Sequence, residues 1–208
     1  MRRAAKRVLV AFAVAALAAA CGSSGATFDP RGPCIADARA PGLFPDLEEK
    51  LPPLLGEVSA QQRDSGRNCS SQALGTLTTH GITDLRYGGA TWTREGGSST
   101  VVAVFASTPD EPALQASWVE EFYSAGAAAS TKTENIEKSR PLLDPAGEVF
   151  RLDTLNQLSF QTVVVWPAPG FVHVVIVATP VAVGGPTRAD HDAAVRIAVQ
   201  WAAIAPIQ

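Results

Sequence analysis

The sequence predicts an α+β fold: a two-layer sandwich in which about three helices pack on a mostly antiparallel sheet of five or six strands. Two hairpins carry this prediction, because each has two apolar strands on either side of a turn rich in glycine or proline. The paired strands are 84–93 with 100–106, and 160–166 with 171–179. Strands joined by short turns pair antiparallel, and helices between the hairpins can cover one face of the sheet.

Three helices are expected, at 70–80, 110–126 and 187–206. In the second, acidic residues and a proline open the segment, and apolar residues then repeat at helical spacing, namely Leu114, Trp118, Phe122 and Ala125. In the third, Thr187 and Asp190 have the spacing of a capping box. A further strand is expected at 148–155, and the polar stretch 130–146 predicts an edge strand or an exposed loop.

The domain organisation follows from changes in composition along the chain. Residues 1–20 predict a signal peptide, and 21–42 predict a flexible tether because they are rich in Gly, Ser, Pro and Ala. Residues 43–208 predict a single globular domain. Within it, 43–69 is expected to be an irregular lead-in, because it contains several prolines and few strand or helix signals.

The N-terminus has the pattern of a secretory signal. Four basic residues lie within the first seven positions, and an apolar run of Ala, Val, Leu and Phe follows from Val8 to Ala20. As a helix this run reaches only about 20 Å at about 1.5 Å per residue, short of the roughly 30 Å hydrocarbon core of a bilayer. An uncleaved membrane anchor is the alternative.

The segment Leu17-Ala18-Ala19-Ala20-Cys21 resembles the lipobox of bacterial lipoprotein precursors. In that family the cysteine is lipidated and becomes the first residue of the mature chain, so the resemblance implies lipidation of Cys21. The family most often has leucine where this chain has Ala18, and ordinary cleavage that leaves Cys21 as a free thiol is the alternative. The resemblance implies an exported protein held on the outer face of a bacterial membrane, either the cell membrane or the outer membrane.

Cysteine usage is consistent with export. The chain has three cysteines, and if Cys21 carries the lipid, Cys34 and Cys69 remain as a pair. Because an exported domain meets oxidising conditions, a disulfide between them is expected. A metal or redox site is the rival interpretation, but no Cys-x-x-Cys spacing or nearby histidine supports it.

Charge limits the choice of partners. Removal of residues 1–20 takes away four positive charges and changes the formal net charge from −3 to −7. This disfavours nucleic acid, which requires a basic surface. The membrane is therefore expected to be contacted through the lipid on Cys21, and another envelope protein is a candidate partner.

No motif predicts catalysis, a cofactor or a metal. The three histidines, His80, His173 and His191, are not at ligand spacing from one another. No nucleophile elbow or phosphate-binding loop is present in the sequence, and neighbouring carboxylates such as Glu120 and Glu121 fit a solvated helix flank. The sequence therefore predicts no catalytic residue, no cofactor and no metal site, and it favours a protein that is not an enzyme.

The four tryptophans are the remaining candidates for a ligand site. Trp118 and Trp201 have helical core spacing, whereas Trp92 and Trp166 lie near strand ends and are the candidate rim of an apolar pocket. The alternative is that all four lie in the core.

Three functions remain open. The leading hypothesis is a non-enzymatic protein-interaction or accessory module of the cell envelope. The second is a small-molecule or lipid-binding lipoprotein with an apolar pocket, and the third is a hydrolase. An exposed apolar patch, an apolar cavity or a cleft with convergent titratable groups would distinguish them.

Overall fold

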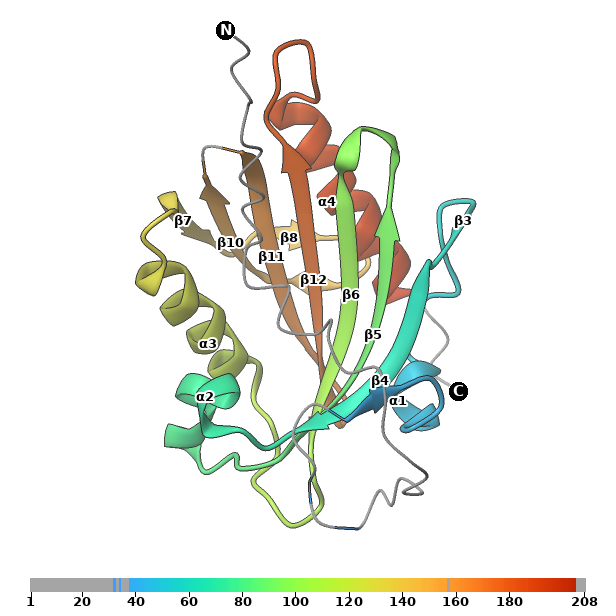
Figure 1. The fold of residues 1–208 in the computed structure, drawn as a ribbon, viewed down its shortest axis with the longest axis vertical. Helices are drawn as coiled ribbons and strands as arrows, with labels where there is room; N and C mark the ends of the chain where they lie inside the picture. The colour runs from blue at the N-terminus through green and yellow to red at the C-terminus, as the bar shows by residue number, and fades with distance from the viewer. Residues whose placement is uncertain (1–31, 33, 35–37, 157, 205–208) are drawn as a thin grey trace, which may run out of the picture.

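The computed structural model describes residues 32, 34, 38–156 and 158–204. The predicted signal peptide, Cys21 and residues 21–31 of the predicted tether lie outside these residues. The described chain forms an antiparallel sheet of eight strands in the order β1-β4-β5-β6-β12-β11-β10-β7 (Figure 1). Its strands are β1 (Arg39–Ala40), β4 (Gln62–Asn68), β5 (Leu85–Thr93), β6 (Ser99–Ser107), β7 (Glu134–Ser139), β10 (Phe150–Leu155), β11 (Ser159–Ala168) and β12 (Phe171–Pro180).

Helices and two small hairpins surround this sheet. The helices are α1 (Pro45–Glu48), α2 (Ser71–Leu74), α3 (Ala116–Ala129) and α4 (Arg188–Ala203), with the 3-10 helices η2 (Gly75–His80) and η3 (Glu95–Gly97). The hairpins are β2 (Leu54–Leu55) with β3 (Val58–Ser59), and β8 (Leu142–Leu143) with β9 (Gly147–Glu148). No helix in the described part of the chain is long and apolar enough to cross a bilayer.

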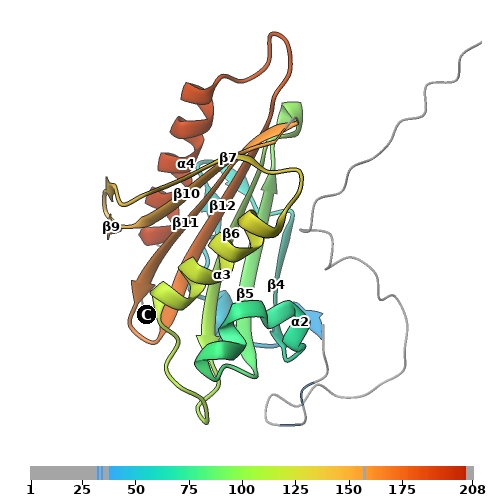
Figure 2. The same ribbon diagram turned by 90° about the vertical axis from the view of Figure 1, so that its left-hand side faces the viewer.

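The sheet is covered on both faces, so the fold has three layers. Figure 2 shows α4 on one side of the sheet and α3 with α2 on the other. The core on the α4 side is built from Phe44, Leu47, Trp92, Val102, Val164, Val175, Val195, Val199 and their neighbours. The core on the α3 side is built from Leu74, Leu77, Ile82, Val119, Leu152, Val165, Val172, Val174 and their neighbours.

The α+β class and the antiparallel sheet are confirmed, but the two-layer arrangement and the count of five or six strands are wrong. The reason is visible in the central strands, which carry apolar side chains on both sides. In β6 the run Val101–Phe105 is apolar at every position, and alternate residues enter the two cores. A strand buried on both faces has such a continuous run, whereas a two-layer sandwich leaves one face polar.

The lead-in to the domain is more regular than the sequence predicts. Residues 62–68, expected to be irregular, form β4, which pairs with β5 over seven residues from Gln62 to Asn68. β1 lies within the stretch expected to be a tether, and it pairs with β4. The sequence did not predict β4 because several of its buried residues are polar. Asp64, Ser65 and Arg67 are buried, and each is held by a polar partner.

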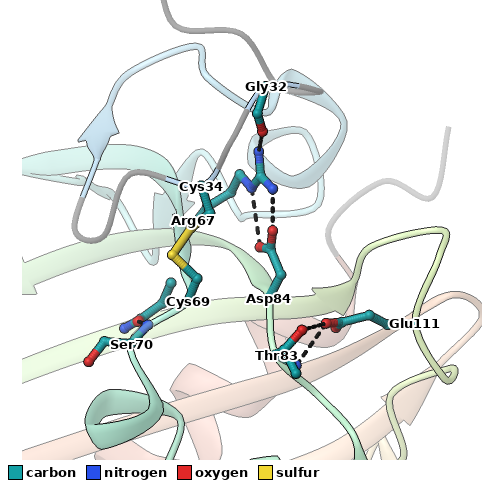
Figure 3. Close-up of a disulfide and its surroundings, with 9 residues drawn as sticks. Gly32, Cys34, Arg67, Cys69, Ser70, Thr83, Asp84 and Glu111 are labelled. Atoms are coloured by element: carbon teal, nitrogen blue, oxygen red, sulfur yellow. Dashed lines mark hydrogen bonds and ion pairs between the residues drawn. A yellow bond between two sulfur atoms is a disulfide. The ribbon is translucent and has the colours of Figure 1, made fainter.

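The disulfide between Cys34 and Cys69 is confirmed (Figure 3). Next to it, Arg67 pairs with the carboxylate of Asp84 and donates from Nη1 to the carbonyl oxygen of Gly32 at 2.9 Å. The disulfide and this arginine together fasten the start of the described chain to the end of β4. The closed loop spans 35 residues, for which a disulfide contributes about 2–4 kcal/mol of stability.

Two of the helix boundaries show how local hydrogen bonds decide where a helix begins. α4 begins as predicted, because Asp190 N–H donates to Thr187 Oγ1 at 3.2 Å and Thr187 N–H donates to Asp190 Oδ2 at 2.8 Å. α3 begins at Ala116, later than predicted. The acidic residue expected in its first turn, Glu111, instead accepts hydrogen bonds from the N–H and hydroxyl of Thr83 (Figure 3).

Candidate functional site

A groove of about 920 Å³ lies on the α3 side of the sheet. Its floor is formed by β6, β12, β11 and β10, and its wall by α3, the segment that follows α3, and the junction of α2 with η2. The apolar floor residues are Val101, Val163, Ile176 and Ala178, and the wall includes Phe122, Tyr123, Gly126, Ala127 and Ala129.

The burial of side chains along β11 and β12 shows how far α3 covers this face of the sheet. In β12, Val172 and Val174 are fully buried, whereas Ile176 on the same face is only half-buried. In β11, Val165 is buried and Val163 is half-buried. The uncovered part of the floor is therefore apolar, and it continues a core that α3 covers at its other end.

The amino-acid composition of α3 explains the gap. Its last two turns read Ser124-Ala125-Gly126-Ala127-Ala128-Ala129, so no large side chain reaches the sheet from this half of the helix. A Cβ atom placed on Gly126 would meet no atom within 4 Å. By contrast, Val119 in the first half of α3 is fully buried. Small residues thus leave space between helix and sheet.

The groove has few groups that can do acid-base chemistry. Its lining contains hydroxyl and amide side chains, among them Thr154, Gln161 and Ser130, and one charged residue, Lys132. Aspartate, glutamate, histidine and cysteine are absent from the lining. Burial raises the pKa of the Tyr123 phenol, so this group stays neutral at ordinary pH. Such a lining can bind an apolar ligand and orient a polar end of it, and it holds no carboxylate, imidazole or thiol.

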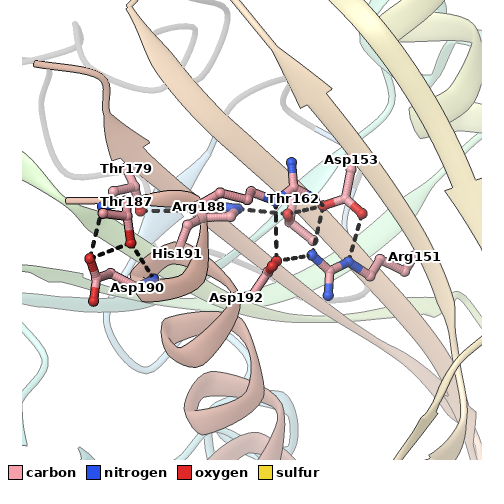
Figure 4. Close-up of polar contacts among 9 residues, drawn as sticks. All are labelled: Arg151, Asp153, Thr162, Thr179, Thr187, Arg188, Asp190, His191 and Asp192. Atoms are coloured by element: carbon pink, nitrogen blue, oxygen red, sulfur yellow. Dashed lines mark hydrogen bonds and ion pairs between the residues drawn. The ribbon is translucent and has the colours of Figure 1, made fainter.

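A second cluster lies on the opposite face, where the first turns of α4 meet β10 and β11 (Figure 4). Arg151 donates to Asp153 at 2.7 Å and to Asp192 at 2.5 Å. Arg188 lies 3.1 Å from Asp153 and 3.3 Å from Asp192. The two arginines and two aspartates balance in charge; Arg151 and Asp153 are largely covered, whereas Arg188 and Asp192 are partly exposed.

His191 extends this network into the core. Thr162 donates its one hydroxyl proton to Asp153, so Nε2 of His191, 2.7 Å from Thr162 Oγ1, is the donor of that contact. Nδ1 then accepts from the hydroxyl of Thr179 at 2.8 Å. Burial, with Arg188 nearby, lowers the pKa of His191 to about 4. Because the imidazole is fully buried and both nitrogens are engaged, His191 fastens α4 to the sheet and is itself closed to a substrate.

The other two histidines are placed differently. His173 lies on the α4 face in β12, stacked on Trp166 with ring centroids 4.8 Å apart, and burial lowers its pKa to about 4. His80 stacks on Trp118 and lies 2.8 Å from Glu121 at the surface. The three histidines are therefore in three separate environments. Within the described ranges, no three His, Cys, Asp or Glu side chains are grouped so that they could hold a metal ion.

Trp92 and Trp166, the expected rim of a pocket, do not line the groove. They are 1% and 4% exposed, and both belong to the core on the α4 side, across the sheet from the groove. Trp92 also donates from Nε1 to the carbonyl oxygen of Val58 at 3.0 Å. Their even positions in β5 and β11 point to the α4 face, whereas the residues that line the groove are the odd positions of β6 and β11 and the even positions of β10 and β12.

Sequence reasoning missed the groove residues because each looks like an ordinary core position. A signal was nevertheless present: a helix that begins with large apolar residues and ends in alanine and glycine packs loosely over its second half. Comparison with known proteins gives no further guide, since no family model, curated protein or solved structure matches the chain.

Proposed function

We propose that this chain is an exported lipoprotein, anchored through Cys21, whose folded part is a non-enzymatic binding module for an apolar small molecule or lipid chain held in the groove beside α3. The observation that carries this proposal is the uncovered apolar floor, Val101, Val163, Ile176 and Ala178, facing a helix of small residues. The groove volume of about 920 Å³ falls within the range typical of small-molecule sites.

The composition of the lining favours binding over catalysis. A hydrolase needs a positioned nucleophile and a base, and the groove lining has no carboxylate, histidine or thiol. The hydroxyl and amide groups of Thr154, Gln161 and Ser130 can orient a polar end of a ligand. The buried cluster around His191 holds titratable groups, but it lies on the other face of the sheet and its imidazole has no exposed surface.

The accessory-protein hypothesis uses a different feature. An apolar groove that is open along one side also fits an apolar peptide segment. The groove is lined mostly by side chains, and its floor strands are already paired on both edges within the sheet, so a peptide would gain no backbone pairing there. This favours a ligand that brings no backbone polar groups of its own.

The test is equilibrium binding of the neutral fluorescent probe N-phenyl-1-naphthylamine to the purified protein. We expect saturable binding with a fluorescence increase, and we expect Gly126→Leu to weaken it at least about tenfold because the new side chain occupies the groove. The same substitution favours the helix by about 1 kcal/mol, so unfolding is not the expected cause of a loss of binding.

Ala128→Leu is the matched control, since Ala128 is exposed on the same helix and does not line the groove. Unchanged binding in this variant, beside lost binding in Gly126→Leu, supports the proposal. Equal affinities in the wild type and both variants would place the probe elsewhere and contradict it.

A further inference from the structure

The floor of the groove changes in polarity along the strands. Cross-strand pairs place its residues in two rows that run across β6, β12, β11 and β10. One row, the apolar row, consists of Val101, Ile176, Val163 and Leu152. The other, the polar row, lies two residues further along each strand and consists of Ser99, Ala178, Gln161 and Thr154. Three of these four side chains carry hydrogen-bonding groups, so the floor itself is amphipathic.

The order of the rows decides how a ligand with one polar end would lie. On the other side of the apolar row, the next set of paired residues is buried in the core on the α3 side: Ala103, Val174, Val165 and Phe150. The apolar row therefore continues a closed apolar layer. The polar row lies farther from that layer, toward the β12–α4 loop at the top of Figure 1. Because an acyl chain gains free energy from burial against apolar side chains, its head group would lie at the polar row.

The wall is polar at the same end of the groove. Residues 130–133 follow α3, line the groove and contain three hydroxyl side chains. They lead directly into β7, whose first residue, Glu134, pairs with Leu155 next to Thr154 of the polar row. The only charged residue of the lining, Lys132, belongs to this exposed segment of the wall and not to the floor. The polar end of the groove is therefore built mainly from neutral groups.

The polar row also has hydrogen-bonding capacity that the described residues do not use. Gln161 donates from Nε2 to Ser159 Oγ at 3.2 Å, and within the described ranges no group donates to its Oε1. The hydroxyl of Thr154 forms no hydrogen bond with a described side chain, although Thr154 is only 8% exposed. An amide oxygen needs a donor, whereas a hydroxyl can donate or accept. A head group with hydroxyls satisfies both residues, whereas a carboxylate offers no donor and would place its charge over a neutral floor.

We infer that the groove selects a single-chain amphiphile with an uncharged, hydroxyl-bearing head, the chemistry of a monoacylglycerol. Its head lies at the polar row and its chain over the apolar row. This inference rests on the proposed function and adds the class of ligand and its orientation. Gln161 is the residue that distinguishes the head group, because its Oε1 accepts a hydrogen bond that only a donor can supply.

The test is displacement of N-phenyl-1-naphthylamine from the purified protein by three ligands with the same acyl chain: 1-decanoylglycerol, methyl decanoate and decanoate. All are used below the concentrations at which they form micelles. We expect 1-decanoylglycerol to bind at least about tenfold more tightly than the other two, because only its head supplies hydroxyl donors. Equal binding of the methyl ester, or tighter binding of decanoate, would overturn the inference and leave the groove proposal standing. Failure of all three to displace the probe would contradict both.

Two variants of the polar row test the orientation of the ligand. Gln161→Leu removes the amide, and Thr154→Val removes the hydroxyl with little change in shape. Each should weaken binding of 1-decanoylglycerol by about threefold to tenfold and leave binding of methyl decanoate unchanged within about twofold. The matched control is Gln200→Leu on α4, outside the groove lining, which should change neither affinity. Equal weakening of the two esters in the polar-row variants would mean general damage to the groove and would contradict a role in selecting the head group.

Discussion

The two faces of the sheet differ in how completely a helix covers them. On the α4 side, Val102, Val164 and Val175 are at most 1% exposed, and the helix above them contributes Val195 and Val199. On the α3 side, the corresponding half of the floor is only half-buried under a run of alanine and glycine. The helices are similar in length, at 16 and 14 residues. Side-chain volume, rather than helix length, therefore decides which face becomes a closed core and which keeps a groove.

The polar groups differ in the same way. The α4 side contains a network in which ion pairs and hydrogen bonds join Arg151, Asp153, Arg188, Asp192 and, through Thr162, His191. The groove on the α3 side is lined by neutral hydroxyl and amide groups and by Lys132. Paired charges favour a single arrangement of α4 on the sheet, whereas neutral groups at the edge of an apolar floor can bind the polar end of a ligand.

The largest difference in stability is expected when the same substitution, to aspartate, is made at two neighbouring positions of β12 that face opposite sides of the sheet. Val175→Asp places a carboxylate in the closed core and should lower the free energy of unfolding by about 4 kcal/mol or more. Ile176→Asp points into the groove, where water can reach it, and should lower it by about 1–2 kcal/mol. Urea unfolding of the two variants measures the difference. Equal losses would mean that the groove is as closed as the core.

The disulfide should affect stability without affecting either face. Replacement of Cys34 and Cys69 by serine should lower the free energy of unfolding by about 2–4 kcal/mol, mainly because the unfolded chain gains freedom. Probe binding at a temperature well below the melting transition should be retained. Loss of binding in the folded variant would show that the lead-in helps to shape the groove.

A smaller loss of stability is expected at acidic pH, and it should arise from His173 in the core on the α4 side. Burial lowers the pKa of His173 to about 4, below its ordinary value of 6.5, so the unfolded chain takes up a proton more readily than the folded one. The contribution of His173 to the free energy of unfolding is therefore fully present above pH 6.5, and it is lost as the pH decreases toward about 4. For this one residue the loss between pH 7 and about pH 4.5 should be about 2 kcal/mol.

His173→Phe isolates this contribution. The phenyl ring can keep the contacts with Trp166 and Phe171, and the substitution removes a buried Nδ1 that lacks a hydrogen-bond partner within the described residues. The variant should be at least as stable as the wild type at pH 7 and should lose less stability in acid by about 2 kcal/mol. Parallel acid profiles for the two proteins, measured by thermal unfolding, would assign the sensitivity to other groups.

The elements that the sequence predicted well are those with strong local signals. The two hairpins, the capping box of α4 and the cysteine pair each depend on a few neighbouring residues or on simple arithmetic, and the structure agrees with all of them. β4 was missed because its buried residues are polar, and their burial depends on partners far along the chain, such as Arg39 for Asp64. The number of layers was also missed, although the continuous apolar run of β6 indicated two buried faces.

The candidate site could be predicted least. Whether Val163 and Ile176 are covered depends on where α3 crosses the sheet, and periodicity gives the face of a strand but not the position of a helix above it. The tryptophans attracted attention as pocket residues because they are large, and for the same reason they fill the core. The residues that leave the groove open are the small ones, Gly126 and its alanine neighbours.

Photoaffinity labelling with a long-chain alcohol that carries a diazirine near the end of its chain tests the central claim most directly. The labelled peptides can be mapped by mass spectrometry in the wild type and in Gly126→Leu. Labelling concentrated on Val163, Ile176 and Ala129, and lost in the variant, is the result expected for a ligand in the groove. Labelling that is spread over the surface, or that persists unchanged in Gly126→Leu, would contradict the claim that the uncovered half of the α3 face is a binding site.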